Sequence, residues 1–435
     1  MHAILPPVTT DRRRVLAWCF FDWANSPYTT LVVTFVYSAY FAQTFAPDVV
    51  TGTAWWSRAI TVSGIAVALL APLLGAAADR GGTRIRWLGA TTATCVLATG
   101  ALAFVTPEPG HALLALSLFV LADIGFELGM LFYNALLPTV APPERLGRVS
   151  GYGWALGYGG GLVALVLALL GLVQPAAPWF GISRADGFNY RATCLLAAIW
   201  LAVFSLPLFL TLREARRPGT GVEFTSVFRE VATTFRNVRQ YRDAGLFLIA
   251  RLLFNDGLIT VFAFGGIYAA GTFGMTLAEV IQFGIAINVT AGLGALLFGF
   301  VDDRIGGRRT VLVSCAALAV ATALAVWAPT RAWFWVAGMA IGVFAGPNQS
   351  ASRSLMARFA PRGSENEFFG FFAFSGRLTA FAGPALLGIA TQAFHSQRAG
   401  VATVLIFFIV GGGLLLLVDE DRGRHAALSS VSPPS

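Results

Sequence analysis

The sequence contains no lysine, and all 30 of its basic residues are arginine. Charged residues of either sign make up only 12% of the 435 residues, whereas 56% of them are hydrophobic. An ordinary soluble domain needs more polar residues than this to cover its surface. The composition therefore excludes a soluble protein of ordinary surface and indicates a chain that resides in a lipid bilayer.

Histidine and cysteine are also scarce, at four residues each. The cysteines stand singly among apolar residues, without the close spacing of a metal site or a disulfide framework, so we expect them to be packing residues. The histidines fall in tails and short loops, and no nucleophile stands out beside a base. The sequence thus predicts no metal site, no cofactor and no enzymatic activity.

Long apolar runs fill most of the chain. A helix needs about 20 apolar residues to cross the hydrocarbon core, so a chain of this length has room for roughly a dozen spans. Dividing the sequence by its apolar runs gives twelve predicted spans, at 15–45, 54–78, 86–105, 112–140, 149–173, 190–212, 245–270, 277–301, 310–328, 332–359, 368–394 and 400–418. We therefore predict an all-α integral membrane protein with twelve transmembrane helices.

The arginines indicate how these spans are oriented. With the N-terminus inside the cell, 22 arginines fall in cytoplasmic segments, five fall outside and three lie within spans. Basic residues are enriched in the cytoplasmic loops of membrane proteins. The net charge of +8 therefore reports orientation rather than nucleic-acid binding, and it predicts that both termini are cytoplasmic.

One polar signature occurs twice with identical internal spacing, each time after an apolar run that ends on the cytoplasmic side. It runs from Gly75 to Arg84 and again, 224 residues later, from Gly299 to Arg308. Its charged residues are Asp79, Arg80 and Arg84 in the first copy and Asp303, Arg304 and Arg308 in the second. The duplication predicts two pseudo-symmetric bundles of six helices.

A second correspondence supports the duplication. The stretch Thr139–Pro142 and the glycines that follow it align with Arg358–Pro361 and its following glycines at a constant offset of 219. We expect an N-terminal bundle at 1–212, a cytoplasmic linker at 213–244, a C-terminal bundle at 245–420 and a cytoplasmic tail at 421–435. The linker carries apolar residues at helical spacing and arginines elsewhere around the wheel, which predicts an interfacial helix.

Polar residues inside the spans mark the candidate site, because an ionisable side chain in hydrocarbon costs several kcal/mol. In span 1 the polar residues recur at helical spacing, and Pro27 frees a backbone carbonyl that a ligand or ion could use. The candidate substrate or coupling residues are Asp22, Asn25, Glu127, Asn134, Arg251, Asn255, Asp256, Gln349, Arg353 and Arg377.

These residues would suit a zwitterion. Carboxylates at Glu127 and Asp256 complement an ammonium group, and guanidinium groups at Arg251 and Arg353 complement a carboxylate. Glu127 and Asp256 are also the candidate proton carriers, since burial favours the neutral form of a carboxyl group. Arginine–carboxylate pairs that simply fasten the two halves are the structural alternative for the same residues.

The repeated signature resembles the loop between the second and third helices of the major facilitator superfamily of transporters. The resemblance implies that spans 1, 4, 7 and 10 line a central path, and those spans hold most of the candidates. It also implies that the two signatures form a gate that latches the cytoplasmic side in the outward-open state. Because Asp79 and Asp303 end their helices at the negative pole of the helix dipole, each requires an arginine or a neighbouring helix N-terminus as partner.

Several further segments resemble one branch of that superfamily, the autophagy-related vacuole effluxer-like family, whose bacterial members are called unknown major facilitators. The segments are Phe21–Tyr28, Phe132–Pro138, Val149–Tyr158, Asn255–Gly257, Ser352–Ser354 and Glu367–Gly370. Eukaryotic relatives are associated with exporting amino acids from the vacuole, which implies an amino-acid-like substrate. Residues Pro347–Ser350 depart from the family pattern, so specificity is expected to differ if span 10 contacts the solute.

Taken together, these features predict a secondary active transporter of a small polar solute that works by rocking of its two halves. The expected partners are a small-molecule solute, protons as one option for the coupling ion, and the lipid bilayer. We expect a monomer in a bacterial cytoplasmic membrane. Two alternatives remain open: a non-transporting receptor or scaffold on a transporter fold, and a drug or metabolite exporter.

Overall fold

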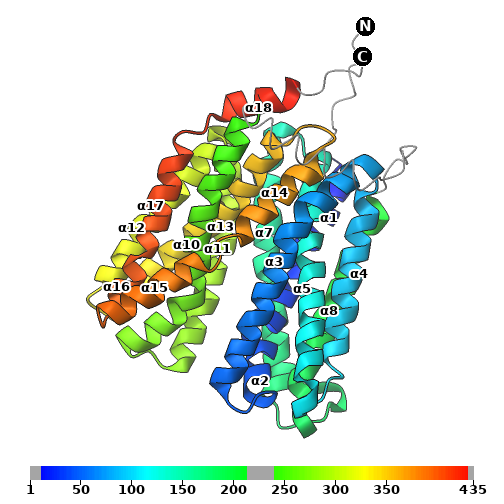
Figure 1. The fold of residues 1–435 in the computed structure, drawn as a ribbon, viewed down its shortest axis with the longest axis vertical. Helices are drawn as coiled ribbons and strands as arrows, with labels where there is room; N and C mark the ends of the chain where they lie inside the picture. Colours follow the sequence, from blue (N-terminus) through cyan, green and yellow to red (C-terminus); the bar gives the residue numbers. More distant parts are fainter. Residues whose placement is uncertain (1–10, 213–239, 430–435) are drawn as a thin grey trace.

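The computed structural model describes residues 11–212 and 240–429, and every regular element in those ranges is a helix. Figure 1 shows two helical bundles side by side, the first coloured blue to green and the second yellow-green to red. The interfacial helix predicted within the linker at 213–244 falls largely outside the described residues.

The first bundle contains six spans. Span 1 is built of three consecutive helices, and spans 4 and 5 each continue into a short second helix. The bounds are α1 (Arg12–Pro27), η1 (Tyr28–Phe35) and α2 (Tyr37–Thr44); α3 (Val49–Gly81); α4 (Arg84–Leu102); α5 (Ala112–Ala135) and α6 (Leu137–Val140); α7 (Leu146–Ala168) and η4 (Leu169–Val173); and α8 (Phe188–Thr211).

The second bundle also contains six spans, and a short helix lies across its end. Span 11 is broken between two helices, and so is span 12. The bounds are α10 (Arg242–Phe273), α11 (Leu277–Ile305), α12 (Gly307–Trp327), α13 (Arg331–Phe359), α14 (Glu365–Arg377) with α15 (Ala382–Ala393), α16 (Gln397–Ala402) with α17 (Val404–Leu415), and the terminal α18 (Glu420–Ser429).

These spans agree closely with the apolar segments of the sequence. The largest discrepancy is at α3, which begins at Val49 rather than near residue 54. Among the described residues, nine helices are long and apolar enough to cross a membrane by composition alone. The other three spans are the interrupted span 1, α4, which begins with arginines, and α13, which contains the polar run Asn348–Ser354.

Local signals explain where several of these helices begin and end. The carboxylate of Asp48 accepts the backbone N–H of Thr51 at 2.9 Å and caps α3. Thr276 and Glu279 form a reciprocal capping box at the start of α11. Gly82 ends α3 at a φ of 56°, a left-handed conformation that favours glycine, so this glycine of the repeated signature makes the turn into α4.

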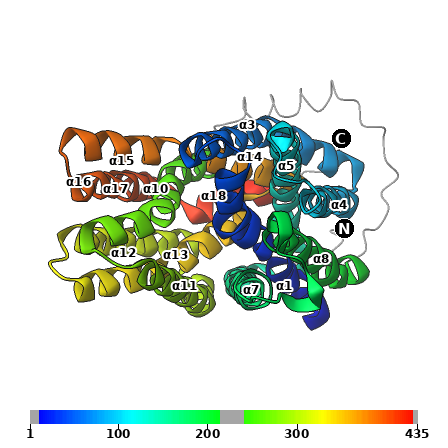
Figure 2. The same ribbon diagram turned by 90° about the horizontal axis from the view of Figure 1, so that it is seen from below.

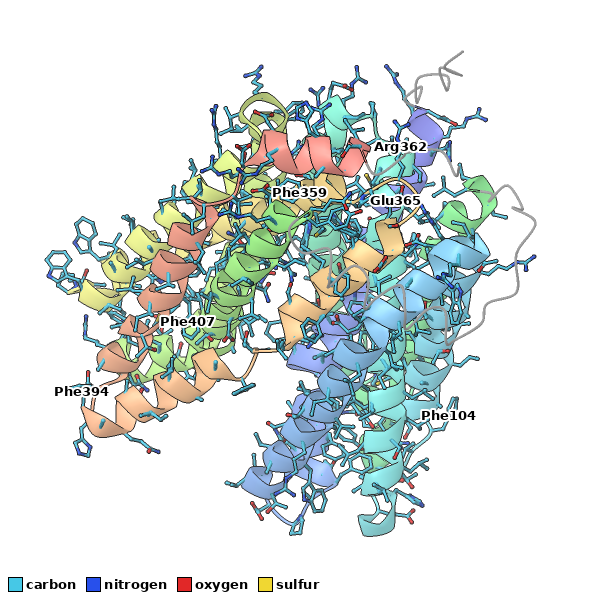
Figure 3. The ribbon with its side chains drawn as sticks, turned by 45° about the horizontal axis from the view of Figure 1, so that its top comes forward. Phe104, Phe359, Arg362, Glu365, Phe394 and Phe407 are labelled. Carbon is cyan, nitrogen blue, oxygen red and sulfur yellow. The ribbon has the colours of Figure 1, made fainter. Side chains whose placement is uncertain are left out.

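The two bundles meet closely at one end of the molecule. We call this the arginine-rich end, because it carries Arg12, Arg13, Arg14, Arg80, Arg84, Arg86, Arg145, Arg148, Arg304, Arg308, Arg309, Arg358, Arg362, Arg422 and Arg424. In Figure 3, Arg362 and Glu365 mark this end, and Phe104 and Phe394 mark the opposite end. Viewed along the helices in Figure 2, α3 lies beside α14 and α7 lies beside α11.

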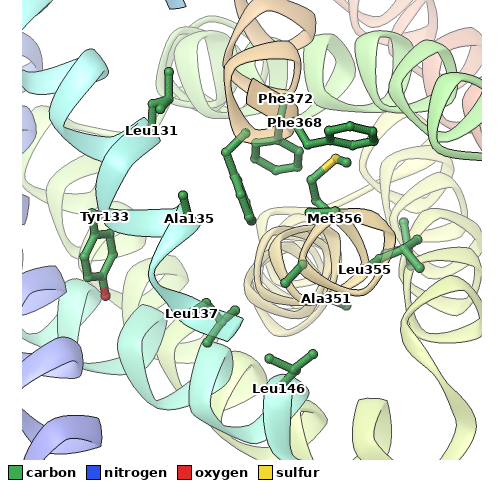
Figure 4. Close-up of a cluster of buried hydrophobic side chains, with 14 of the residues drawn as sticks. Leu131, Tyr133, Ala135, Leu137, Leu146, Ala351, Leu355, Met356, Phe368 and Phe372 are labelled. Atoms are coloured by element: carbon green, nitrogen blue, oxygen red, sulfur yellow. The ribbon is translucent and has the colours of Figure 1, made fainter. Parts of the chain in front are cut away.

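The buried apolar side chains show where the halves are joined. One large core contains residues of both bundles near the arginine-rich end, including Leu131 and Leu137 from the first and Leu355 and Phe368 from the second (Figure 4). Toward the opposite end, the described residues form separate cores, one entirely within each bundle. The halves therefore share a core at the arginine-rich end and diverge away from it, as the ribbon in Figure 1 also shows.

Candidate functional site

The first contact between the halves is centred on Asp79, in the last turn of α3. Its carboxylate accepts the backbone N–H of Glu367 at 2.8 Å and the side-chain amide of Asn366 at 2.7 Å, both in the first turn of α14. Arg84 bonds Asp79 at 3.0 Å and also pairs with Glu365 of the other half. We call this group of five residues the first latch.

The second contact repeats the arrangement with the halves exchanged. Asp303, near the end of α11, accepts the backbone N–H of Gly147 at 2.8 Å and that of Arg148 at 3.4 Å, in the first turn of α7. The Nε of Arg148 donates to the same carboxylate at 2.5 Å. We call these three residues the second latch.

The two latches are related by the internal repeat. Asp79 and Asp303 are separated by 224 residues, whereas Gly147 and Arg148 precede Asn366 and Glu367 by 219, which are the two offsets found in the sequence. Each aspartate ends its own helix and caps the N-terminus of a helix in the opposite half. The positive pole and free N–H groups of that helix supply the partner that the dipole argument requires.

Glycines of the repeated signature allow this close approach. A Cβ at Gly75 would lie 2.3 Å from the carbonyl oxygen of Asn366, and one at Gly299 would lie 2.8 Å from the Cα of Arg148. Both distances are far below van der Waals contact, so neither position can carry a side chain without separating the helices. Small residues serve here to bring backbones together.

The remaining members of the predicted gate lie elsewhere. Arg80 and Arg304 are exposed at the arginine-rich end. Arg308 donates to the carbonyl oxygens of Leu415 and Leu416, at 3.1 and 2.8 Å, and so fastens the end of α17 within its own half. Of the six predicted gate residues, therefore, Asp79, Arg84 and Asp303 make the contacts between halves described above.

Five latch residues were not among the sequence candidates: Gly147, Arg148, Glu365, Asn366 and Glu367. The signal that could have found Arg148 is the offset of 219, because it pairs Arg148 with Glu367 just before the aligned glycines. Glu365 lies two residues earlier and has no comparable signal. A glutamate in the first turn of a helix is already explained by its favourable interaction with the helix dipole, so it does not by itself indicate a contact between the halves.

A buried ion pair lies deeper between the halves. Arg353 of α13 donates to Asp22 of α1 at 2.9 Å, and the two side chains are only 2% and 7% exposed. The same guanidinium donates to the side chain of Asn134 at 3.3 Å and to both oxygens of Ser150, at 2.8 and 2.7 Å. It also lies over the ring of Trp18 at 4.7 Å. This network joins span 10 to spans 1, 4 and 5, and it is closed to solvent.

Asn25 and Gln349 lie in the neighbourhood of this network. The amide of Asn25 donates to the sulfur of Met130 at 3.2 Å. The side chain of Gln349, on α13, accepts the hydroxyl of Tyr158, on α7, at 2.6 Å, which is another contact between the halves.

The carbonyl freed by Pro27 has a hydrogen-bond partner within the protein. Proline removes the hydrogen bond to the carbonyl four residues earlier, which is that of Trp23. This carbonyl instead accepts the indole N–H of Trp200 at 3.1 Å. One acceptor position of this carbonyl is therefore used within the first bundle, and its service to a ligand or ion stays a prediction.

Among the described ion pairs between the halves, the pair formed by Glu127 of α5 and Arg377 of α14 is the one in which both side chains are at least 20% exposed. Their side chains are 20% and 25% exposed, against 7% or less for both members of the Asp22–Arg353 pair. Asp123 lies one turn from Glu127 and accepts the hydroxyl of Ser63 at 2.5 Å. Accessible charges of both signs thus face each other where span 11 breaks.

The break itself corrects the single span predicted at 368–394. The chain leaves the helix after Arg377 and resumes at Ala382, with Pro384 in the first turn of α15. A proline is tolerated in a first turn but disrupts a continuous helix, because it lacks the N–H and clashes with the preceding turn. Pro384 therefore explains the interruption.

Three candidates on α10 hold the ends of the broken helix. Arg251 donates to the carbonyl oxygen of Phe372 at 2.7 Å and Asn255 donates to that of Gly376 at 3.4 Å, near the end of α14. Asp256 accepts the backbone N–H of Gly383 at 3.1 Å, at the start of α15. Each charge complements the helix pole that it faces, positive at the C-terminus and negative at the N-terminus.

These placements change the predicted zwitterion site. Arg353 is occupied by Asp22, and Asp256 is 1% exposed at the start of α15. Arg251 is occupied by α14 and lies over the ring of Phe372 at 3.5 Å. Of the four residues proposed for the zwitterion, only Glu127 lies at the accessible contact.

Within residues 11–212 and 240–429, no group of three or more histidine, cysteine, aspartate or glutamate side chains is placed to hold a metal ion. The four cysteines are buried and unpaired with one another. These side chains therefore offer no candidate metal centre among the described residues.

The arrangement of the two six-span halves is similar to that of several solved membrane transporters. The structure superposes on the proton:xylose symporter XylE, a major facilitator superfamily protein, with a TM-score of 0.74 and 12% identity, over 95% of this chain and 97% of that one. The human organic anion transporter MFSD10 gives a TM-score of 0.70 with 16% identity, over 94% of this chain and 100% of that one. The protein thus has the major facilitator fold.

Sequence similarity identifies the family. A model of the vacuole effluxer Atg22-like family matches residues 50–428, so the chain belongs to that family of transporters and is not an enzyme. The uncharacterized MFS-type transporter YxiO of Bacillus subtilis is 27% identical over 414 residues, covering 93% of this chain and 94% of the relative. Autophagy-related protein 22 of Yarrowia lipolytica is 24% identical over 318 residues, covering 64% of this chain and 51% of the relative. The chain thus spans about half of the fungal protein's length over this match.

Proposed function

We propose that this protein is a secondary transporter of a small zwitterionic solute of the amino-acid type, and that the structure is its outward-open state. The positive-inside rule assigns the arginine-rich end to the cytoplasm. Both latches and the shared apolar core lie at that end, whereas the cores at the other end are separate. This arrangement supports a solute path that is closed to the cytoplasm and open to the outside.

The observation that carries the proposed substrate class is the Glu127–Arg377 pair. It is partly exposed, joins the two halves and lies beside the break in span 11. Transporter sites commonly lie near the bilayer midplane, at interrupted helices between repeats. A zwitterion can replace the internal pair, with its carboxylate on Arg377 and its ammonium group on Glu127, so that neither of these partly buried charges is left without a partner.

Alternating access would then proceed by rocking of the halves about this pair. Opening toward the cytoplasm requires both latches to release, since each attaches an aspartate of one half to a helix N-terminus of the other. Protonation of Glu127 would remove its attraction for Arg377, which gives a route for proton coupling. The match to a family of vacuole effluxers supports export as the direction of transport.

The test is counterflow in proteoliposomes with a panel of labelled amino acids, using the full-length protein and two variants, Glu127→Gln and Arg377→Gln. We expect exchange of at least one amino acid by the wild type and its loss in both variants. The matched control is Glu279→Gln, which neutralises one member of an exposed pair with Arg331 at 3.3 Å. Exchange that survives in both site variants would overturn the proposed site.

Absence of exchange by folded, inserted wild-type protein would overturn the amino-acid assignment. A panel of organic cations and anions then distinguishes a drug or metabolite exporter from a protein that does not transport. Either outcome would leave the fold and the two latches unchanged.

A further inference from the structure

A groove of about 570 Å³ lies beside the second latch, between two helices of the first half and one of the second. In Figure 2 the three helices, α1, α7 and α11, lie in a row along one side of the molecule. The groove is lined by Arg12, Val15, Leu16 and Cys19 of α1, by Arg145, Arg148, Val149, Tyr152, Ala155 and Leu156 at or within α7, and by Leu296 of α11.

The charge in this groove is confined to one end. Its three arginines, Arg12, Arg145 and Arg148, lie at the arginine-rich end, and the remaining lining side chains are apolar apart from the hydroxyl of Tyr152 and the thiol of Cys19. The lining residues of α1, at positions 12, 15, 16 and 19, share one face of the helix because they are related by steps of three and four, so the groove runs along the helix axis. In the bilayer it would extend from the cytoplasmic headgroup region into the hydrocarbon.

Carboxylates near this end leave the positive charge in excess. Asp11 caps α1 through the backbone N–H of Arg13, and Glu144 is exposed beside Arg145. Asp303 binds Arg148 through its Nε. Asp302 lies against Gly147 and is paired with Arg358. Even if all four carboxylates are counted, Arg12, Arg13, Arg14, Arg145 and Arg148 outnumber them.

We propose that this groove is a binding site for one anionic phospholipid of the cytoplasmic leaflet. The phosphate would lie among the three arginines, and an acyl chain would lie along α1 and α7 toward Leu156 and Leu296. Basic pockets between transmembrane helices on the cytoplasmic side bind anionic lipid headgroups, and each nearby arginine contributes to the attraction. A free phosphate or nucleotide would use the charged end but would leave the apolar length of the groove unoccupied.

The lipid would also act on the second latch. Arg148 belongs both to the groove and to the latch, and Leu296 belongs to the opposite half from the other lining residues. Leu296 is one of eleven lining residues, so the complete groove, with the wall that α11 supplies, is present only while α7 and α11 lie side by side. A ligand that binds only this arrangement shifts the equilibrium toward it, so the anionic lipid should favour the state that is closed at the arginine-rich end.

The test measures lipid binding and does not depend on which solute is transported. Full-length protein is prepared in nanodiscs of phosphatidylcholine alone or with phosphatidylglycerol, and retained lipid is counted by native mass spectrometry. The groove variant is Arg12→Gln with Arg145→Gln, which spares Arg148 and therefore the latch. The matched control is Arg86→Gln with Arg309→Gln, two exposed arginines of the same end that do not line the groove.

We expect one retained phosphatidylglycerol in the wild type and in the control, and affinity at least about tenfold lower in the groove variant. A second variant, Leu16→Trp, keeps the charge and alters an exposed position of the apolar wall, so it should weaken phosphatidylglycerol without changing the response to inorganic phosphate. Equal lipid retention in the groove variant and the control would overturn the proposal. So would thermal stabilisation by inorganic phosphate or glycerol 3-phosphate that matches that of phosphatidylglycerol, since it would show a soluble-anion site.

Discussion

The carboxylate of Asp303 accepts the backbone N–H of Gly147 at 2.8 Å, so the end of α11 in one half caps the start of α7 in the other. The same relationship joins Asp79 to Glu367 at 2.8 Å with the halves exchanged. A capping contact inside one helix stabilises that helix. A capping contact between halves stabilises one arrangement of the two halves, because it is lost when they separate.

Neutralising a latch should therefore change the conformational equilibrium. Asp303→Asn and Asp79→Asn each remove a charged acceptor, and hydrogen bonds to charged groups contribute about 1.5–3 kcal/mol. We expect either variant to open the arginine-rich end more often. Spin labels can be attached at Arg86→Cys and Arg309→Cys, which are exposed positions of opposite halves. The distance between the two labels, measured by double electron–electron resonance, should be longer in the latch variants than in the wild type.

The control for this measurement is Asp421→Asn, an exposed carboxylate of α18 at the same end. It should leave the distance distribution at its wild-type form. A distribution unchanged by both latch variants would contradict the role assigned to Asp79 and Asp303.

Gly75, a glycine of the repeated signature beside the first latch, allows a steric test of the same contact between the halves. Gly75→Ala would place a methyl group 2.3 Å from the carbonyl oxygen of Asn366, so we expect separation of α3 from α14 and a lower melting temperature. Gly64, eleven residues earlier on the same helix, has nothing within 4 Å of an added Cβ. Gly64→Ala should be neutral or slightly stabilising, because alanine is favoured over glycine in a helix by up to about 1 kcal/mol. Equal melting temperatures for the two variants would show that the close contact between α3 and α14 at Gly75 does not contribute to stability.

The sequence was sufficient to predict the spans and the duplication, because apolar length and repeated spacing are properties of the chain alone. Even the weakest boundary, the start of α3 at Val49, was misplaced by little more than one turn. The offsets of 224 and 219 were visible in the sequence as well. The structural role of these offsets could not be predicted, since it depends on which helix N-terminus each aspartate contacts in the opposite half.

For the polar candidates too, the sequence indicated which residues are unusual but not which residues they contact. Their burial in spans identified Arg251, Asp256 and Arg353 as unusual, but composition could not assign their partners. Arg251 and Asp256 hold the two ends of a helix break that was not predicted, and Arg353 is enclosed by Asp22 and Ser150. Pairing of side chains depends on the relative position of helices far apart in sequence, which one sequence does not reveal.

Because the Asp22–Arg353 pair is buried, removing either side chain should lower the free energy of unfolding. Removing one member leaves an uncompensated buried charge, which typically costs about 3–5 kcal/mol. We expect Asp22→Asn and Arg353→Gln each to lower the thermal unfolding midpoint strongly, and the double variant to lose less than the sum of the two. A double-mutant cycle on purified protein measures this coupling. Strict additivity would show that the two side chains contribute independently.

The last prediction separates the two candidate proton carriers. Glu127 joins the halves through Arg377, whereas Asp256 caps α15 within its own half. In the proposed transport cycle, protonation of Glu127 therefore changes a contact between the halves, whereas protonation of Asp256 changes a contact within one half. We expect Glu127→Gln to abolish accumulation driven by an imposed pH gradient, and Asp256→Asn to lower stability while keeping the response to the gradient. Solute accumulation in proteoliposomes, with and without the gradient, measures both. If Asp256→Asn alone removes the pH response, the proton passes through α10 and the assignment to Glu127 is wrong.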